Sequence, residues 1–173
     1  MRWKNIGETT TENGHKLYYS GLPDVHEQGV GFHVHRNYNN CVVNCYPISS
    51  RLISIRLKAS PFNITIIQAY APTSTYDDEA VEKFYDQLQE VVNKVPKKDI
   101  LVVQGDCNAK VGSDSYQTWK GTCGKYSNLS TNEQGQRLFI HTRMPQKIAY
   151  NHMAQSERRA PQPDRLYHGA TAF

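Results

Sequence analysis

The segment GDCNAKVG at residues 105–112 holds the side chains with the clearest chemical potential in the chain. Its Asp106 and Asn108 follow the apolar run ILVVQ at 100–104, which has the pattern of a strand buried on both faces. Residues two apart in an extended backbone point to the same side, and open sheets bind ligands at the carboxyl ends of their strands. A carboxylate there can accept a proton from water, and an amide can hold a phosphate or the attacking water. The pair therefore predicts a hydrolytic site.

Tyr70 is a second candidate, because it ends another apolar strand pattern in QAYAPTS at 68–74. A tyrosine hydroxyl at such a place can bind a phosphate oxygen. Each candidate also has a structural explanation. Asp106 and Asn108 would form an Asx-turn that caps the strand end, and Tyr70 would be a half-buried aromatic residue at the rim of a sheet.

The histidine and cysteine patterns do not predict a metal site. His33 and His35 alternate along a strand pattern but have no cysteine or carboxylate at ligand spacing, so we expect ordinary strand residues. Cys41 and Cys45 do not form a C-x-x-C pair, and the chain offers no second pair, which leaves a structural zinc site unsupported. Cys107 alternates with its two polar neighbours, so it is expected to pack in the core rather than act as a nucleophile.

The secondary-structure elements that position these residues are predicted to be strands up to residue 70, then a helix, a buried strand and a second helix. Short apolar and β-branched runs between polar or proline-containing breaks predict a largely antiparallel sheet. These candidate strands lie at 17–19, 29–35, 41–46, 51–58 and 62–70. Helical spacing with one buried stripe follows at 81–95 and stops at Pro96, and a weaker helix is predicted at 133–143. Strands, a helix and then a buried strand indicate an α+β layered domain.

Residues 144–173 differ from the rest, with three arginines, three prolines and few apolar residues in any period. We predict a domain over 1–143 and a divergent, poorly ordered basic tail over 144–173. The length of 173 residues fits one domain. There is no apolar run of about 18 residues, and no apolar signal segment opens the chain, so the sequence predicts an intracellular protein without a membrane partner. The net charge of +4 favours an anionic partner only weakly.

Taken together, the order of the motifs resembles the endonuclease/exonuclease/phosphatase superfamily. The motifs are YYSG (18–21), GVGF (29–32), RLISIRLK (51–58), IIQAYAPTS (66–74) and GDCNAKVG (105–112). Within the superfamily, the chain is similar to the endonuclease domains of LINE-type retrotransposons and to craniofacial development protein 2-like sequences. The resemblance covers most of residues 1–143.

This resemblance implies a partial four-layered α/β sandwich, in which two mainly antiparallel sheets pack together and are flanked by helices. It also implies a Mg²⁺-dependent phosphodiesterase whose partner is DNA, with a nuclear location. Members of the LINE branch nick DNA so that the new end primes reverse transcription. By position, Asp106 would orient or deprotonate the attacking water, Asn108 would contact the phosphate, and Tyr70 would contact the scissile phosphate or stabilise its charge.

The chain also departs from the family pattern. The family has a metal-binding glutamate just before the segment matching MRWK (1–4) and a final S-D-H motif, and neither is found in this sequence. Asp164 and His168 are not adjacent and do not follow the expected strand. Losing one such electrostatic group costs a factor of about a hundred to a thousand in rate. We therefore expect a catalytically incomplete endonuclease; the alternatives are a nucleic-acid or protein binding remnant, a small-phosphoester phosphatase, or a decayed reading frame.

Overall fold

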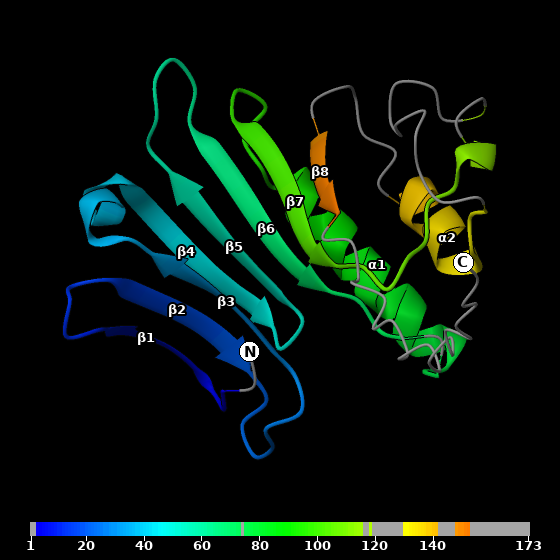
Figure 1. Ribbon diagram of the computed structural model, residues 1–173, viewed down its shortest axis with the longest axis horizontal. Helices are drawn as coiled ribbons and strands as arrows, with labels where there is room; N and C mark the ends of the chain where they lie inside the picture. Colours follow the sequence, from blue (N-terminus) through cyan, green and yellow to red (C-terminus); the bar gives the residue numbers. More distant parts are fainter. Residues whose placement is uncertain (1–2, 74, 116–117, 119–129, 142–147, 153–173) are drawn as a thin grey trace, which may run out of the picture.

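Two groups of strands build two separate sheets that pack face to face (Figure 1). The computed structural model describes residues 3–73, 75–115, 118, 130–141 and 148–152. In these residues a three-stranded sheet has the order β1-β2-β3, and a five-stranded sheet has the order β4-β5-β6-β7-β8. The first sheet comprises β1 (Ile6–Thr10), β2 (Lys16–Gly21) and β3 (Gly29–Val34). The second comprises β4 (Val42–Ser49), β5 (Leu52–Leu57), β6 (Ile64–Tyr70), β7 (Ile100–Asp106) and β8 (Ile148–His152).

The direction of the strands changes within the five-stranded sheet. The pairs β4–β5 and β5–β6 are antiparallel, whereas β6–β7 and β7–β8 are parallel. Helix α1 (Asp78–Asn93) connects β6 to β7, because a parallel pair needs a long crossover connection. As a result, the carboxyl ends of β6 and β7 lie at the same edge of the sheet, with Tyr70 opposite Asp106.

Helix α1 begins and packs as its sequence predicts. The Asp77 carboxylate caps the amino end by accepting a hydrogen bond from the Ala80 N–H at 2.7 Å, and acidic residues in the first turn suit the helix dipole. One face of the helix is buried, with side chains at helical spacing (Val81, Phe84, Tyr85, Leu88 and Val92). Burying a side chain of this kind contributes about 1.5–3 kcal/mol, so this face fixes the helix on the sheet.

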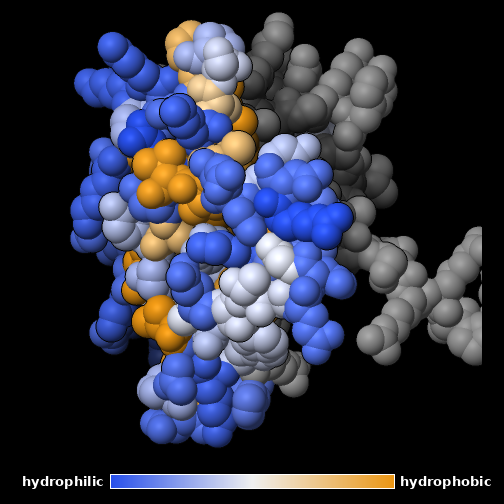
Figure 2. Space-filling model, turned by 90° about the vertical axis from the view of Figure 1, so that its left-hand side faces the viewer, coloured by the Kyte–Doolittle hydropathy of each residue, from blue (hydrophilic) through white to orange (hydrophobic). Residues whose placement is uncertain are grey.

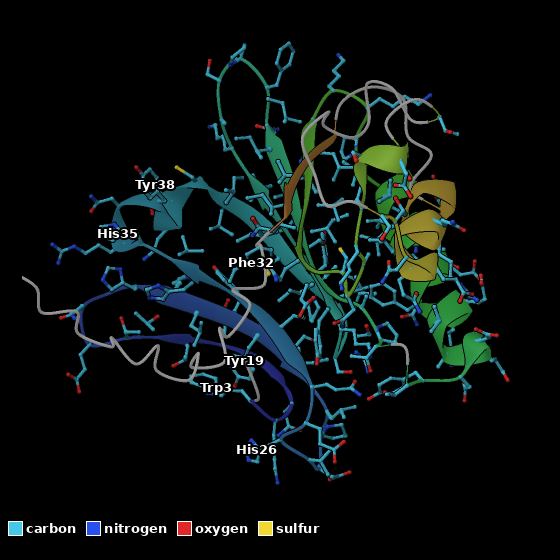
Figure 3. The ribbon with its side chains drawn as sticks, turned by 45° about the vertical axis from the view of Figure 1, so that its right-hand side comes forward. Trp3, Tyr19, His26, Phe32, His35 and Tyr38 are labelled. Atoms are coloured by element: carbon cyan, nitrogen blue, oxygen red, sulfur yellow. The ribbon has the colours of Figure 1, made fainter. Side chains whose placement is uncertain are left out.

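Apolar side chains on the two faces of the five-stranded sheet form two cores. One core lies under α1 and α2 (Glu133–His141) and includes Leu52 and Ile67 of the sheet. The other lies between the two sheets and includes Phe32 and Ile55, and Figure 3 shows Phe32 pointing into this space. This arrangement of packed sheets with flanking helices confirms the α+β partial sandwich and its mainly antiparallel pairing.

Most predicted elements are present, but not all consecutive strands of the predicted antiparallel sheet pair with each other. The runs at 29–35 and 41–46 do not pair, because the short 3₁₀-helix η1 (Arg36–Cys41) carries the chain from one sheet to the other. Strand β1 was not predicted, since its sequence IGETT is polar and almost entirely exposed. It is ordered by antiparallel pairing with β2 rather than by burial.

Within the predicted tail the structure describes one strand, at Ile148–His152, and the poor order of residues 144–173 stays a prediction. This strand is β8, which adds to the open edge of β7 in a parallel register from Leu101↔Ile148 to Gly105↔His152. Backbone pairing at a sheet edge needs no apolar periodicity, so the sequence pattern did not reveal it. The domain boundary at residue 143 stays a prediction, and Asp164 and His168 lie outside the described residues.

The surface seen from the left-hand side of Figure 1 is mainly hydrophilic, with separate hydrophobic spots rather than one continuous patch (Figure 2). The large exposed hydrophobic residues in the described part include Tyr38, Val43 and Tyr46. Single exposed residues of this kind are normal and do not mark a binding face. None of the described helices has the length and apolar character to cross a membrane.

Candidate active site

The structure brings the three predicted residues together at one edge of the five-stranded sheet. Tyr70 ends β6 and Asp106 ends β7, and the two residues are direct partners in the parallel register. Alternation along both strands places the two side chains on the face toward the three-stranded sheet, since Ile67 and Val103 point to the helices. Tyr70 itself packs against the core between the sheets. The site therefore lies at the rim where the two sheets meet.

Asn108 completes the group through two hydrogen bonds, and a third bond joins the residues that follow β6 and end β7. Its backbone N–H donates to Asp106 Oδ1 at 3.0 Å, and its side-chain Nδ2 donates to the Ala71 carbonyl at 2.7 Å. The Ala71 N–H donates to the Asp106 carbonyl at 2.8 Å. Asn108 has a φ of 46°, a left-handed conformation that asparagine tolerates better than most residues. The Asx-turn expected as the structural alternative is thus present.

The Asx-turn does not use all the polar atoms of these residues. In the part of the chain that the structure describes, Asp106 Oδ2, Asn108 Oδ1 and the Tyr70 hydroxyl have no hydrogen-bond partner. Asp106 is exposed, whereas Tyr70 and Asn108 are half-buried. The turn fixes the orientation of the carboxylate and leaves one oxygen of it open to a ligand. Structural and functional interpretations of the pair are therefore compatible.

Gly105 shapes the backbone immediately before this group. Its φ is 134°, which side chains of L residues rarely adopt. A Cβ atom at this position would also collide with the Ala69 carbonyl oxygen of β6. The glycine thus lets β7 approach β6 closely at the level of the candidate site.

Cys107 points away from the site, as the alternation predicts. Its side chain packs against the core under the helices. Burial, and secondarily the nearby Asp106 carboxylate, raises the pKa of the Cys107 thiol to about 11. The thiol therefore stays protonated at neutral pH and does not serve as a nucleophile.

The loop after the site is held against the start of α2. The Asn132 side-chain oxygen accepts hydrogen bonds from the Lys110 and Gly135 N–H groups at 2.8 and 2.9 Å. The Asp114 carboxylate accepts from both the N–H and the hydroxyl of Thr131, and these bonds lower the pKa of Asp114. Residues 110–115 are thereby fixed relative to the helix layer, which supports the geometry of Asn108.

Arg51 is a neighbour of the site that the sequence analysis missed. It precedes β5 and lies beside Tyr70, whose N–H donates to the Arg51 carbonyl at 2.9 Å. In return, Arg51 Nη1 donates to the Tyr70 carbonyl at 3.2 Å. The guanidinium carbon lies 5.2 Å from the centre of the Tyr70 ring and 4.8 Å from that of Tyr76. The signal that could have located Arg51 is the hairpin register, which sets it opposite Tyr70 once Leu52 pairs with Ala69.

His15, His33 and His35 lie elsewhere, around η1 and the adjoining ends of β2 and β3, where Figure 3 labels His35. The centre of the His15 ring lies 4.6 Å from that of His35 and 5.2 Å from that of His33. His15 Nδ1 accepts a hydrogen bond from the Arg36 N–H, and His35 Nδ1 accepts one from the Asn37 N–H. Within the described ranges, no three His, Cys, Asp or Glu side chains are placed to hold one metal ion.

Comparison with known proteins places the chain among relatives of one kind. Craniofacial development protein 2 from Bos taurus is 37% identical over 143 residues, which is 82% of this chain and 24% of that protein. The homologue from Tragulus javanicus is 36% identical over 143 residues, again with 82% and 24% coverage. This chain is a homologue of part of craniofacial development protein 2.

The craniofacial development protein 2 resemblance predicted from the motifs is thereby confirmed. The chain spans 24% of the length of these relatives, so it corresponds to one segment of them. Among solved structures, the endonuclease domain of TRAS1, a telomere-specific non-LTR retrotransposon, matches with a TM-score of 0.48 and 18% identity, covering 79% of this chain and 56% of that chain. No family model matches the chain.

Proposed function

We propose that this segment, related to craniofacial development protein 2, carries the Asp–Asn–Tyr part of a DNA endonuclease site and hydrolyses phosphodiester bonds weakly by itself. The observation that supports the proposal is the convergence of three polar side chains at the ends of β6 and β7. Each of them keeps an atom with no partner among the described residues. The motif order that resembles LINE-type endonucleases gives the substrate class.

The chemistry follows from the open atoms. Asp106 Oδ2 can accept a proton from a water molecule and orient it toward phosphorus. Asn108 and Tyr70 lie at the same strand ends, and the second Nδ2–H of Asn108 and the Tyr70 hydroxyl can donate to the non-bridging phosphate oxygens. Asn108 Oδ1 is an acceptor and can hold the attacking water. Attack of the water forms a new P–O bond while the bond to one ester oxygen breaks. The water's proton passes to Asp106, and the leaving oxygen takes a proton from solvent water.

Mg²⁺ belongs to this proposal through the resemblance. Asp106 is one carboxylate, and Mg²⁺ usually takes one or two carboxylates together with water and substrate phosphates. We expect low activity, because the metal-binding glutamate and the final S-D-H motif of the family pattern are not found in this sequence.

Nicking of supercoiled plasmid with and without Mg²⁺ tests the proposal. We expect slow nicking by the wild-type chain, abolished by chelation. Asp106→Asn keeps an oxygen for the Asn108 N–H and should lower the rate by a factor of about a hundred or more. Asp86→Asn is the matched control, because Asp86 is an exposed carboxylate of α1 and should leave the rate unchanged. A folded wild-type chain that does not nick, or equal rates for the two variants, would overturn the proposal.

A non-catalytic binding module is the second candidate, and Arg51 beside the site, which makes no ion pair with any described residue, favours it. Binding of nucleic acid without cleavage would fall steeply with added salt, because phosphate contacts release counterions. A protein partner would show a much weaker dependence on salt. Salt titration of binding therefore separates the two forms of this alternative.

A further inference from the structure

Arg51 differs from the other half-buried arginines in the described part of the chain, Arg56 and Arg137, in having no carboxylate partner. Arg56 forms two hydrogen bonds with Asp99, at 2.6 and 2.9 Å. Arg137 contacts three carboxylates that bridge α1 and α2. Among the described residues, Arg51 makes no ion pair, and its guanidinium donates only to the Tyr70 carbonyl.

Two tyrosine rings lie next to the Arg51 guanidinium. The distances of 5.2 Å to the Tyr70 ring and 4.8 Å to the Tyr76 ring are those of cation–π contacts. The rings offset part of the cost of withdrawing a half-buried cation from water, but they do not neutralise its charge. Because a guanidinium has five N–H donors and one bond is made here, several donors remain for an anion.

Residues of the three-stranded sheet region also hold the Tyr76 ring in place. We call Arg51 and the rings of Tyr70 and Tyr76 the platform. Gln28, in the loop between β2 and β3, donates from Nε2 to the Tyr76 hydroxyl at 3.3 Å and accepts from the Ser50 hydroxyl at 3.0 Å. Tyr76 is 44% exposed, so one part of its ring is open to solvent. A ring and a cation fixed before binding lose little conformational freedom when a ligand arrives.

Register places this platform in one row with the candidate catalytic residues. Arg51, Tyr70 and Asp106 follow one another across β5, β6 and β7. At about 4.8 Å between neighbouring strands, the backbones of Arg51 and Asp106 are roughly 10 Å apart. An extended polyanion that passes Asp106 can therefore reach Arg51 as well.

From this arrangement, which rests on the proposed function, we propose that Arg51, which lies beside the rings of Tyr70 and Tyr76, binds a backbone phosphate of the nucleic acid next to the one at Asp106. The planar fork of the guanidinium suits two phosphate oxygens at once. The exposed part of the Tyr76 ring lies beside the same phosphate and offers a stacking face for its nucleotide.

Binding of a short fluorescein-labelled DNA duplex in EDTA tests the inference without requiring cleavage. Affinity is measured by anisotropy over a series of KCl concentrations. Arg51→Gln should weaken binding roughly tenfold and lower the slope of log K against log salt by about 0.9, the value for one lost phosphate contact. Arg36→Gln removes the same charge from an exposed residue of η1 and should leave the slope unchanged.

Two more variants guard against a loss of folding in Arg51→Gln. Arg51→Lys keeps the charge and should keep the salt slope while it weakens affinity by a factor of about three. Tyr76→Leu removes an exposed ring and should weaken binding by a similar factor. Equal affinities and slopes for the wild type, Arg51→Lys and Tyr76→Leu would overturn the inference, as would equal effects of Arg51→Gln and Arg36→Gln in folded chains.

The outcomes also separate this inference from the proposed function. If nicking depended on Asp106 but Arg51→Gln left DNA binding unchanged, the inference would be overturned and the hydrolytic proposal would stand. Arg51-dependent binding without any nicking would overturn the hydrolytic proposal alone. A folded wild-type chain that binds no duplex at low salt would overturn the inference, and the nicking assay would still decide the hydrolysis.

Discussion

The polar groups at the two ends of the β5–β6–β7 segment differ in how far they are hydrogen-bonded. At the amino ends of β6 and β7, Asp99 is 7% exposed and accepts hydrogen bonds from Arg56 and from Thr65, at 2.8 Å for the latter. At the carboxyl ends, Asp106 and Arg51 lie in one row across the strands and keep atoms without partners among the described residues. The first end is closed by a saturated ion pair and serves stability. The second end leaves hydrogen-bonding capacity for a ligand.

The largest effect on stability should come from breaking the closed end. Asp99→Ala leaves the Arg56 guanidinium and the Thr65 hydroxyl without their shared acceptor. We expect the free energy of unfolding to fall by about 2–4 kcal/mol, because a half-buried cation loses its partner. Urea denaturation followed by circular dichroism measures this. If the free energy of unfolding fell by less than about 0.5 kcal/mol, as for an ordinary surface substitution, the Arg56–Asp99 ion pair would not be important for stability.

A somewhat smaller loss of stability is expected for a substitution at Gly105, which shapes the backbone at the carboxyl ends of β6 and β7. Gly105→Ala would force a side chain onto a φ of 134° and against the Ala69 carbonyl. The expected cost is about 1–3 kcal/mol. The same urea experiment gives the value, with Ala109→Gly as a control for a small change at a buried position just after the site. An unchanged urea midpoint for Gly105→Ala would mean that β6 and β7 can move apart at this position without a loss of stability.

Lowering the pH should weaken the closed end gradually. Hydrogen bonding to Arg56, and secondarily to Thr65, lowers the pKa of Asp99 below its usual value near 4. A lowered pKa means that the stabilisation is fully present above the usual value and is lost as the pH falls through the folded-state pKa. The difference in unfolding free energy between wild type and Asp99→Ala should therefore narrow as the pH falls below about 4. A difference that stays constant down to pH 2 would contradict this assignment.

The smallest effect on stability is expected at the site itself. Asp106→Asn keeps an acceptor for the Asn108 N–H, and the residue is exposed. Its free energy of unfolding should change by no more than about 0.5 kcal/mol. Thermal or urea unfolding of the variant used in the nicking assay provides the measurement. A large loss would assign Asp106 to the framework and weaken the comparison between the two ends.

The sequence predicted the parts of this architecture that depend on local pattern. The apolar runs of β5, β6 and β7 and the buried stripe of α1 were visible because burial imposes a period on the residue types. Asp106, Asn108 and Tyr70 were found because they follow two of these runs. Their roles in catalysis stay a proposal.

The missed parts depend on pairing between distant segments. β1 and β8 gain order from hydrogen bonding to β2 and β7, which leaves no apolar pattern in their own sequences. Arg51 became part of the site only through the register of the β5–β6 hairpin and the return of Tyr76 before α1. The left-handed backbone of Asn108 likewise follows from its bonds to Ala71 and Asp106 rather than from residue type alone.

The parallel pairing of β6 and β7 also sets an order of assembly for the site. Arg51 and Tyr70 meet through a local hairpin, whereas Asp106 arrives only after α1 has formed and the crossover has closed. Contacts of long sequence separation form late because the chain must first lose the entropy of the intervening loop. Pulse-labelled hydrogen exchange during refolding should protect the β5–β6 amides before those between β6 and β7. The cation–aromatic half of the site would thus exist in the folding chain before its carboxylate half joins it.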